Sequence, residues 1–154
     1  MRYVYNDGGR EEAGFKGSAG DCVTRAIAIV TDRPYSEIYR EISDEIRAWL
    51  GGRTSKAKRH RMKKRSPYSP RNGVPTPVVK RYLDRLGFEW TPTMGIGTGC
   101  RVHLKDDELP EGRLVVRLTG HICAVMDRVV YDTYDPSRND TRCVYGYWKM
   151  KGDQ

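Results

Sequence analysis

The chain has 154 residues and a formal net charge of +8, and 38% of its residues are hydrophobic. This length suits one domain that buries its own core, so we expect a single domain over residues 1–154. No stretch is apolar and long enough to cross a bilayer, and residues 1–7 lack the hydrophobic core of a signal peptide. We therefore expect a cytoplasmic protein with no membrane partner.

The first predicted elements are a short edge strand over residues 3–5 and a largely apolar helix within residues 17–31. Asp21 is a suitable N-cap, because its carboxylate can accept hydrogen bonds from the amides of the first turn. Apolar residues then recur at helical spacing: Val23, Ala26, Ile27 and Val30. Only Thr24 and Arg25 interrupt the apolar surface. The helix must be buried on most sides, and we predict that it is the central helix of the domain.

Cys22 lies in the first turn of this predicted helix. The partial positive charge of a helix N-terminus favours the thiolate, which is the form of cysteine that attacks carbonyl carbons. Two interpretations stay open for this residue alone: a nucleophile, or a small hydrophobic residue of the core, where cysteine is common. A histidine elsewhere in the chain with a carboxylate partner of its own would favour the nucleophile.

A second, amphipathic helix is predicted to open around Pro34, which suits the first helical position. Its apolar residues repeat at helical spacing: Tyr35, Ile38, Ile42, Ile46, Trp49 and Leu50. Gly51 and Gly52 are expected to end it. A third helix is predicted over residues 76–87, with proline at its first helical position and glycine at its end.

Positive charge is concentrated in a basic segment at about residues 51–75, which we predict to be a flexible insertion. Its basic residues are Arg53, Lys56, Lys58, Arg59, Arg61, Lys63, Lys64 and Arg65, followed by Arg71. No acidic residue offsets them between residues 53 and 71. Such a cluster can neutralise phosphates and attract nucleic acid regardless of its sequence. The alternative is a solvated segment that like charges keep disordered.

The second half of the chain predicts strands. They are expected over residues 88–90, 100–104, 113–118, 121–126, 129–135 and 142–150, with a glycine-rich loop at 94–99 and one helical turn at 106–109. Because helices come first and antiparallel strands follow, the sequence predicts an α+β fold. In this fold the N-terminal helices pack on one side of a mainly antiparallel sheet.

Residues 119–136 predict a β-hairpin with a two-residue turn at 127–128. This register places Asp132 on the same sheet face as His121, diagonally across the ladder, so that the carboxylate can orient the imidazole. A turn one residue longer would exchange the roles of the two nearby aspartates. Asp132 is therefore the first choice for the partner of His121, and Asp135 is the alternative.

A histidine held by a carboxylate and offered to a cysteine at a helix start is what nucleophilic thiol catalysis needs. The chain order Cys22, His121, Asp132 and the segment GHICAVMDRVVYDTYDP resemble the papain-like and transglutaminase-like cysteine enzymes, over about residues 14–150. The resemblance implies a papain-like fold with the nucleophile on its central helix. It also implies Cys22 as nucleophile, His121 as general base and acid, and Asp132 as the residue that orients His121.

The sequence departs from that family at the oxyanion hole. Papain-like enzymes usually place a glutamine a few residues before the cysteine, whereas the only glutamine here is Gln154. The backbone amide of Cys22 can supply one donor to the oxyanion. Asn6, Lys16 or Ser18 can supply another, and the sequence does not choose among them. Loss of one such donor typically costs about 10²- to 10³-fold in turnover.

A competing interpretation of the same strands is a zinc site. Cys100, His103, His121 and Cys123 are of the right types and their spacing within each pair is feasible, although structural zinc sites usually use tighter cysteine pairs on turns. With no secretion signal, we expect the four cysteines to be reduced thiols rather than a disulfide framework, and Cys143 to be a packing residue.

The sequence therefore predicts a thiol hydrolase (peptidase, isopeptidase or amidase) or an acyl transferase that needs no cofactor. Its expected partner is a protein or peptide substrate, acidic if the basic segment recruits it. The alternative is a catalytically silent scaffold that binds nucleic acid or protein through the basic segment. Replacing the arginines and lysines of that segment separates the two, because only an enzyme would keep its reactivity toward a small uncharged substrate.

Overall fold

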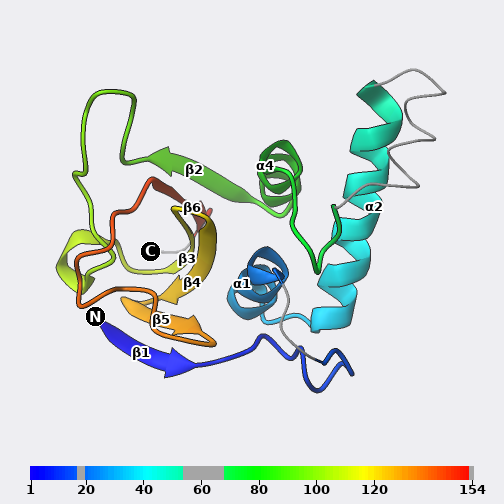
Figure 1. Cartoon of the computed structure of the whole chain (residues 1–154), viewed down its shortest axis with the longest axis horizontal. Helices are drawn as coiled ribbons and strands as arrows, with labels where there is room; N and C mark the ends of the chain where they lie inside the picture. The colour runs from blue at the N-terminus through cyan, green and yellow to red at the C-terminus, as the bar shows by residue number, and fades with distance from the viewer. Residues whose placement is uncertain (17–19, 54–67, 153–154) are drawn as a thin grey trace.

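The computed structural model describes residues 1–16, 20–53 and 68–152. This part of the chain has a mixed α+β fold, in which helices pack on a six-stranded, mostly antiparallel sheet (Figure 1). The helices are α1 (Cys22–Thr31), α2 (Tyr35–Arg53) and α4 (Thr76–Arg85), with a 3-10 turn, η1 (Asp106–Glu108). The strands are β1 (Arg2–Tyr5), β2 (Phe88–Pro92), β3 (Arg113–Leu118), β4 (His121–Met126), β5 (Val129–Asp132) and β6 (Gly146–Met150). The predicted α+β class is confirmed.

The strand order across the sheet is β1-β5-β4-β3-β6-β2. Neighbouring strands are antiparallel except β1 and β5, which run parallel. The edge strand expected near residues 3–5 is present as β1, and its register places Tyr5 beside Asp132 at the end of β5. The strand that carries the candidate acid is therefore flanked on both sides.

Both faces of the sheet are buried. Strand alternation sends Val115 of β3 toward the helices, whereas Leu114 and Val116 point to the opposite face. On that second face they pack with Leu104 and Val144, which belong to the loops between β2 and β3 and before β6. The helices thus cover one face of the sheet and the loops cover the other. The burial of each such aliphatic side chain is worth about 1.5–3 kcal/mol.

Helix α1 lies between the sheet and α2 (Figure 1), in contact with β4 on one side and with α2 on the other. All its residues from Val23 to Val30 are buried, and Ile27 and Val30 have no exposed surface. The helix ends at Asp32, whose left-handed conformation (φ 54°) lets its backbone amide bond to carbonyls of the last turn. The buried helix predicted from the apolar pattern is confirmed.

The amphipathic patterns of α2 and α4 also agree with their burial. Ile38, Ile42 and Ile46 of α2 and Val78 and Leu83 of α4 are buried in the same core. The predicted end of α2 is wrong, because the helix continues through both glycines to residue 53. Glycine costs a helix only about 0.5–1 kcal/mol per residue, and the preceding turn is anchored in the core.

The predicted two-residue turn of the hairpin is confirmed. Asp127 and Arg128 have positive φ angles of 48° and 68°, which the tight hairpin turns require of both central residues. Met126 pairs with Val129, and the ladder continues to Ala124 beside Tyr131. The register that brings Asp132 toward His121 therefore follows from the turn.

Three predicted strands are shorter or absent. The strand expected over 129–135 ends at Asp132, and the one expected over 142–150 begins at Gly146. Between them the chain turns, with positive φ at three consecutive residues, 138–140, which interrupts any extended run. Residues 100–104 form only an isolated bridge, between His103 and Cys143.

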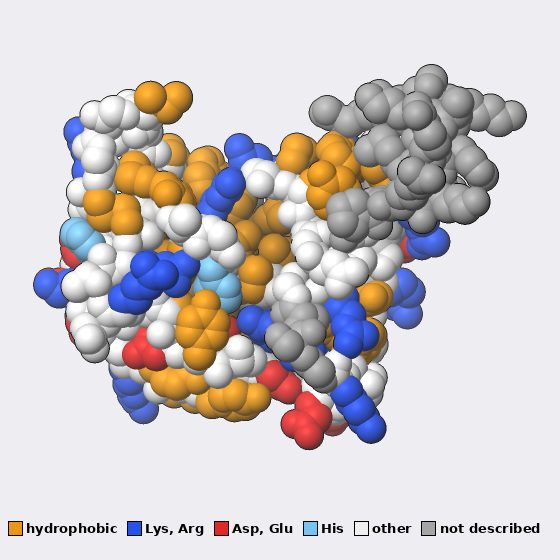
Figure 2. Space-filling view, viewed as in Figure 1, with side chains coloured by type: hydrophobic (Ala, Val, Ile, Leu, Met, Phe, Trp, Pro, Cys, Tyr) orange, Lys and Arg blue, Asp and Glu red, His pale blue; other side chains and the backbone are white. Residues whose placement is uncertain are grey.

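Aromatic side chains join β2 to β6. The rings of Trp90 and Trp148 lie 4.4 Å apart, and the ring of Trp90 also covers Gly146, which has no side chain to obstruct it. Lys80 of α4 lies over the Trp90 ring. Figure 2 shows hydrophobic side chains gathered over β2, β6 and α4, with basic side chains around them.

Within the described ranges, no helix has the length and apolar character needed to cross a membrane.

Candidate functional site

Cys22 is the first residue of α1 and is half-buried. The start of the helix is held by the turn at residues 69–73. A Cβ atom on Gly20 would lie 3.2 Å from the carbonyl oxygen of Asn72, and the hydroxyl of Thr24 donates to the carbonyl of Pro70 at 2.6 Å. These contacts fix where the helix begins and therefore where the thiol lies.

His121 begins β4 directly after the turn Thr119-Gly120, where Gly120 has a positive φ of 62°. Two contacts hold this turn. The guanidinium of Arg142 donates to the carbonyl of Thr119 at 2.7 Å, and the hydroxyl of Thr119 donates to that of Tyr145 at 2.9 Å. The imidazole is thus presented from a tight and well-anchored hairpin end.

Asp132 ends β5 and lies against His121. Its Oδ2 is 2.6 Å from Nε2 of His121, and its Oδ1 accepts the backbone amide of Thr133 at 2.7 Å. The side chain is 3% exposed. The carboxylate of Asp135, the alternative partner, instead accepts the backbone amide of Ser137 at 3.0 Å. The structure therefore brings Asp132 to the histidine.

The imidazole of His121 acts on the Cys22 thiol as a hydrogen-bonding neighbour. Because Nε2 faces Asp132, the ring nitrogen left for the thiol is Nδ1. The backbone amide of Ile122 acts on the sulfur as well. Cys22, His121 and Asp132 thus form a row drawn from α1, β4 and β5, in which His121 and Asp132 are hydrogen-bonded.

The electrostatics of this row favour a thiolate and an imidazolium. Burial raises the pKa of the Cys22 thiol, but the hydrogen bond and charge of His121, the Ile122 amide and the Arg25 guanidinium together bring it below its ordinary value. Burial lowers the pKa of His121, but hydrogen bonds to Asp132 and Cys22 and their negative charges raise it to about 9. Both shifts stabilise the charged pair near neutral pH.

A second row of charges lies behind the first. Arg25, which is 7% exposed, forms ion pairs with Asp21 through Nη1 and with Asp132 through Nη2, the latter at 3.4 Å. Asp21 is fully buried and also accepts the hydroxyl of Tyr35 at 2.8 Å and faces Nε of Arg10 at 3.3 Å. The predicted N-cap hydrogen bond of Asp21 is absent. Its carboxylate serves the buried ion pairs instead.

Tyr134 is a further neighbour of the histidine. Its ring centroid lies 5.2 Å from that of His121, and 48% of the residue is exposed. The aromatic ring therefore covers part of the imidazole on the solvent side. The two-residue turn predicts this neighbour, because its register, when continued, sets Tyr134 opposite His121, although β5 itself ends at Asp132.

The candidates for the second oxyanion donor are only partly described. The side-chain carbonyl of Asn6 accepts the amide of Gly8 at 2.8 Å, and Asn6 borders a cavity of about 780 Å³ lined by the C-terminal half of α1 and the start of α2. Lys16 is exposed, and its backbone carbonyl accepts the guanidinium of Arg71. Ser18 lies outside the described residues. The second donor stays a prediction.

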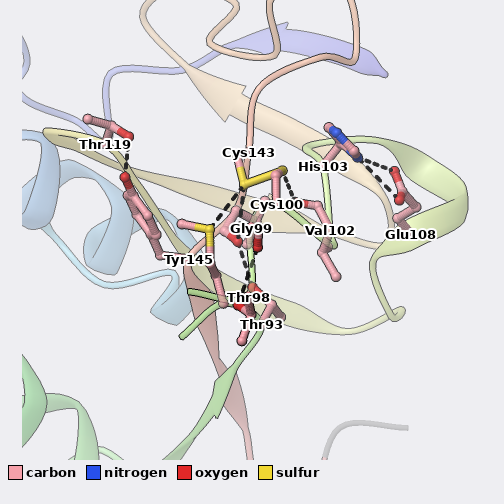
Figure 3. The surroundings of a disulfide bond; sticks show 12 residues. Thr93, Thr98, Gly99, Cys100, Val102, His103, Glu108, Thr119, Cys143 and Tyr145 are labelled. Carbon is pink, nitrogen blue, oxygen red and sulfur yellow. Dashed lines mark hydrogen bonds and ion pairs between the residues drawn. A yellow bond between two sulfur atoms is a disulfide. The ribbon is translucent and has the colours of Figure 1, made fainter. Parts of the chain in front are cut away.

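The four residues of the zinc alternative are not brought together. Cys100 forms a disulfide with Cys143 (Figure 3), so the expectation of four reduced thiols, with Cys143 as a packing residue, is wrong for this pair. His103 faces Glu108 at 3.3 Å. Cys123 is free and buried, and burial raises the pKa of its thiol well above the ordinary value. Within the described ranges, no three His, Cys, Asp or Glu side chains are grouped to hold a metal.

Most of the predicted polyanion-binding residues lie outside the described part of the chain. These are Lys56, Lys58, Arg59, Arg61, Lys63, Lys64 and Arg65, and the side chain of Arg53 is not described either. Arg71, at the end of the basic segment, is described, and its guanidinium lies 6.0 Å from the ring centroid of Phe15.

Sequence reasoning missed the partners of Arg25, although one signal was present. Arg25 is the only charged residue between Cys22 and Thr31, in a helix that must be buried. A charge in such a place needs a partner of opposite sign. Which carboxylates would meet it depends on how segments far apart in the chain come together.

No protein-family model, no curated protein and no solved structure matches this chain.

Proposed function

We propose that the protein is a thiol hydrolase or acyl transferase that works through an acyl-enzyme on Cys22. The observation that carries the proposal is the hydrogen bond from His121 to Asp132, with the Cys22 thiol beside the imidazole and the cysteine at the first turn of a helix. A nucleophile, a base and a residue that orients the base, in contact in that order, are what acyl transfer through a thiol needs.

In the first half of the reaction the Cys22 thiolate attacks the carbonyl carbon of an amide, isopeptide or thioester. The new carbon–sulfur bond pushes an electron pair onto the carbonyl oxygen, which the backbone amide of Cys22 at the helix start can stabilise. When the intermediate collapses, the bond to the leaving group breaks. The leaving group takes the proton of the His121 imidazolium.

In the second half a water molecule or an amine attacks the thioester carbonyl. His121, now neutral, accepts the proton of the attacking group, and Cys22 leaves as the thiolate. Attack by water releases a carboxylic acid, and attack by an amine releases the acyl group as an amide. Asp132 holds the imidazole by its Nε2 throughout and stabilises its positive charge.

The order of the three residues and the buried position of α1 support a papain-like arrangement, with the nucleophile on a central helix. An acidic protein or peptide is the proposed substrate, recruited by the basic segment. The silent scaffold that binds nucleic acid or protein through the same segment is the alternative. The cytoplasmic location stays a prediction, and the disulfide between Cys100 and Cys143 is of a kind that persists mainly in oxidising compartments.

The proposal is tested by the rate at which iodoacetamide labels Cys22 between pH 5 and 10, read by peptide mass spectrometry. The labelling rate rises over the pH range in which the thiol ionises, which we call the thiolate limb. In the wild type this limb should lie at lower pH than that of a free thiol. In His121→Ala the limb should move to higher pH, because burial is then opposed only by the Ile122 amide and the Arg25 charge. The buried Cys123 in the same sample serves as an unreactive internal control.

A second measurement asks for the acyl-enzyme itself. A small uncharged activated ester should leave an acyl group on the Cys22 peptide of the wild type, and the adduct should be missing in His121→Ala. Slow labelling of Cys22 with an ordinary thiol limb, unchanged in His121→Ala, would overturn the proposed function. Salt-dependent binding of nucleic acid would then be the next measurement.

A further inference from the structure

The ion pairs of Arg25 are unusual for their burial. The guanidinium lies between two carboxylates, Asp21 and Asp132, that are themselves 0% and 3% exposed. Removal of one partner from a buried ion pair is strongly destabilising, because a charge is left without compensation. Replacement of a whole buried ion-pair cluster by well-packed apolar side chains, in contrast, is often neutral or stabilising. Stability alone therefore does not account for an arginine here.

The charges around the thiol balance. Arg10 and Arg25 face Asp21 and Asp132, and the remaining ionisable pair is Cys22 with His121. The groups that face this cluster from the neighbouring elements are the hydroxyl of Tyr35 on α2 and that of Tyr3 on β1, which donates to the carbonyl of Asp132. The thiol and imidazole can thus exist as an ion pair without leaving a net charge in the protein interior.

We propose that Arg25 is a positioning residue of the site. It fixes the Asp132 carboxylate against His121, and its positive charge balances the negative charge of that carboxylate. This inference rests on the proposed function. Asp132 has two oxygens: Oδ2 is turned to the histidine, and Oδ1 is held by Arg25 and the Thr133 amide. The guanidinium and the Thr133 amide therefore together set the direction in which Oδ2 points.

The balance predicts the sign of each substitution. Loss of the Arg25 charge leaves one more negative charge near the sulfur, which disfavours the thiolate and moves its titration to higher pH. Loss of the Asp21 charge does the opposite, because Arg25 is then shared with Asp132 alone. Arg25→Lys keeps the charge but loses the two-pronged contact, so its effect should lie between those of the wild type and Arg25→Gln.

The experiment measures the pH dependence of Cys22 alkylation by iodoacetamide in the full chain. Arg25→Gln should move the thiolate limb up by about one pH unit, as expected for a unit charge several ångströms away in a partly buried site. Asp21→Asn should move it down. The double variant Arg25→Gln/Asp21→Asn restores the charge balance and should bring the limb back toward the wild-type position.

Two control variants separate this role from a structural one. Arg33→Gln removes the same charge from an ion pair with Glu37 and Glu41, at the other end of α1. Thr31→Val removes a hydrogen bond to the carbonyl of Ile27 from the last turn of the same helix. Each should leave the limb in place, whatever it does to stability. If Arg25→Gln does not fold, Arg25→Lys and Asp21→Asn carry the test.

The outcomes distinguish this inference from the proposed function. If His121→Ala moves the thiolate limb but Arg25→Gln and Asp21→Asn do not, the thiol–imidazole pair stands and the role of Arg25 is overturned. The inference is equally overturned if Arg33→Gln or Thr31→Val moves the limb as far as Arg25→Gln. If His121→Ala itself has no effect, the proposed function fails first.

Discussion

At the scale of single residues, the candidate site is a group of buried, ionisable side chains that stabilise one another's charges. His121 contacts a thiol on one side and a carboxylate on the other, and its pKa of about 9 keeps the imidazole protonated at neutral pH. The pKa of Cys22 is lowered by the same contacts. A pair of this kind holds its nucleophile and its acid ready at the same pH.

This pairing predicts a bell-shaped pH profile for acyl transfer. The rate should rise as Cys22 ionises and fall again near pH 9, where His121 loses the proton that the leaving group needs. Alkylation of the same thiol needs no acid, so it should reach a plateau instead of falling. Steady-state hydrolysis of an activated ester or thioester over pH 5–10 measures the first profile, and iodoacetamide labelling measures the second.

Asp132→Asn is the matched variant for this profile. It removes the carboxylate charge that raises the pKa of His121, so the alkaline limb should move to lower pH. An alkaline limb that stays in place in Asp132→Asn would show that His121 is not the group that titrates there.

At the scale of secondary-structure elements, the sequence was most informative where local rules fix the geometry. The hairpin of β4 and β5 has a two-residue turn, and strand alternation then carries Asp132 to the side of His121. The strand predicted over 100–104 is reduced to an isolated bridge, and the one predicted over 142–150 begins only at Gly146, after the turn at residues 138–140. The buried contact of Arg25 with Asp132 joins residues 107 positions apart, which no local pattern reports.

The β2–β6 pair carries a prediction of its own. A Cβ atom on Gly146 would lie 2.3 Å from the Trp90 ring and 2.8 Å from the carbonyl of Thr91. We expect Gly146→Ala to lower the free energy of unfolding by about 1–3 kcal/mol, as in other overpacked sites. Chemical denaturation followed by tryptophan fluorescence measures the change.

Gly51 offers a control of opposite sign. It lies in α2, and a Cβ atom there would meet no neighbouring atom within 4 Å. Gly51→Ala should raise the free energy of unfolding by about 0.5–1 kcal/mol, because alanine favours the helix. Equal effects of the two substitutions would contradict the close approach of Trp90 to Gly146.

At the scale of the whole molecule, the loops on the second face of the sheet are tied together by the Cys100–Cys143 disulfide. Val144, which follows Cys143, belongs to the buried cluster on that face, and Tyr145 contacts the turn that precedes His121. Figure 3 shows the disulfide and the Thr119–Tyr145 contact in one view. The cross-link therefore supports the layer opposite the helices.

Removal of this cross-link should cost stability. The disulfide spans a sequence separation of 43 residues, and closure of a loop of that size is worth up to about 4 kcal/mol. Cys143→Ser should unfold at a lower denaturant concentration than the wild type, and reductant should lower the wild-type midpoint to a similar value. Thiol titration of the denatured, unreduced protein should find the two free cysteines, Cys22 and Cys123. If reductant shifts Cys143→Ser as much as the wild type, the disulfide is not the cause.

The long sequence separation within the charged cluster has a kinetic consequence. The thiol lies near one end of the chain, whereas the histidine and both strands that orient it lie beyond residue 112. Contacts so far apart close slowly in folding, after local turns and helices have formed. Fast alkylation of Cys22 should therefore appear late during refolding. The alkylation rate of this single thiol then reports when the two halves of the chain dock.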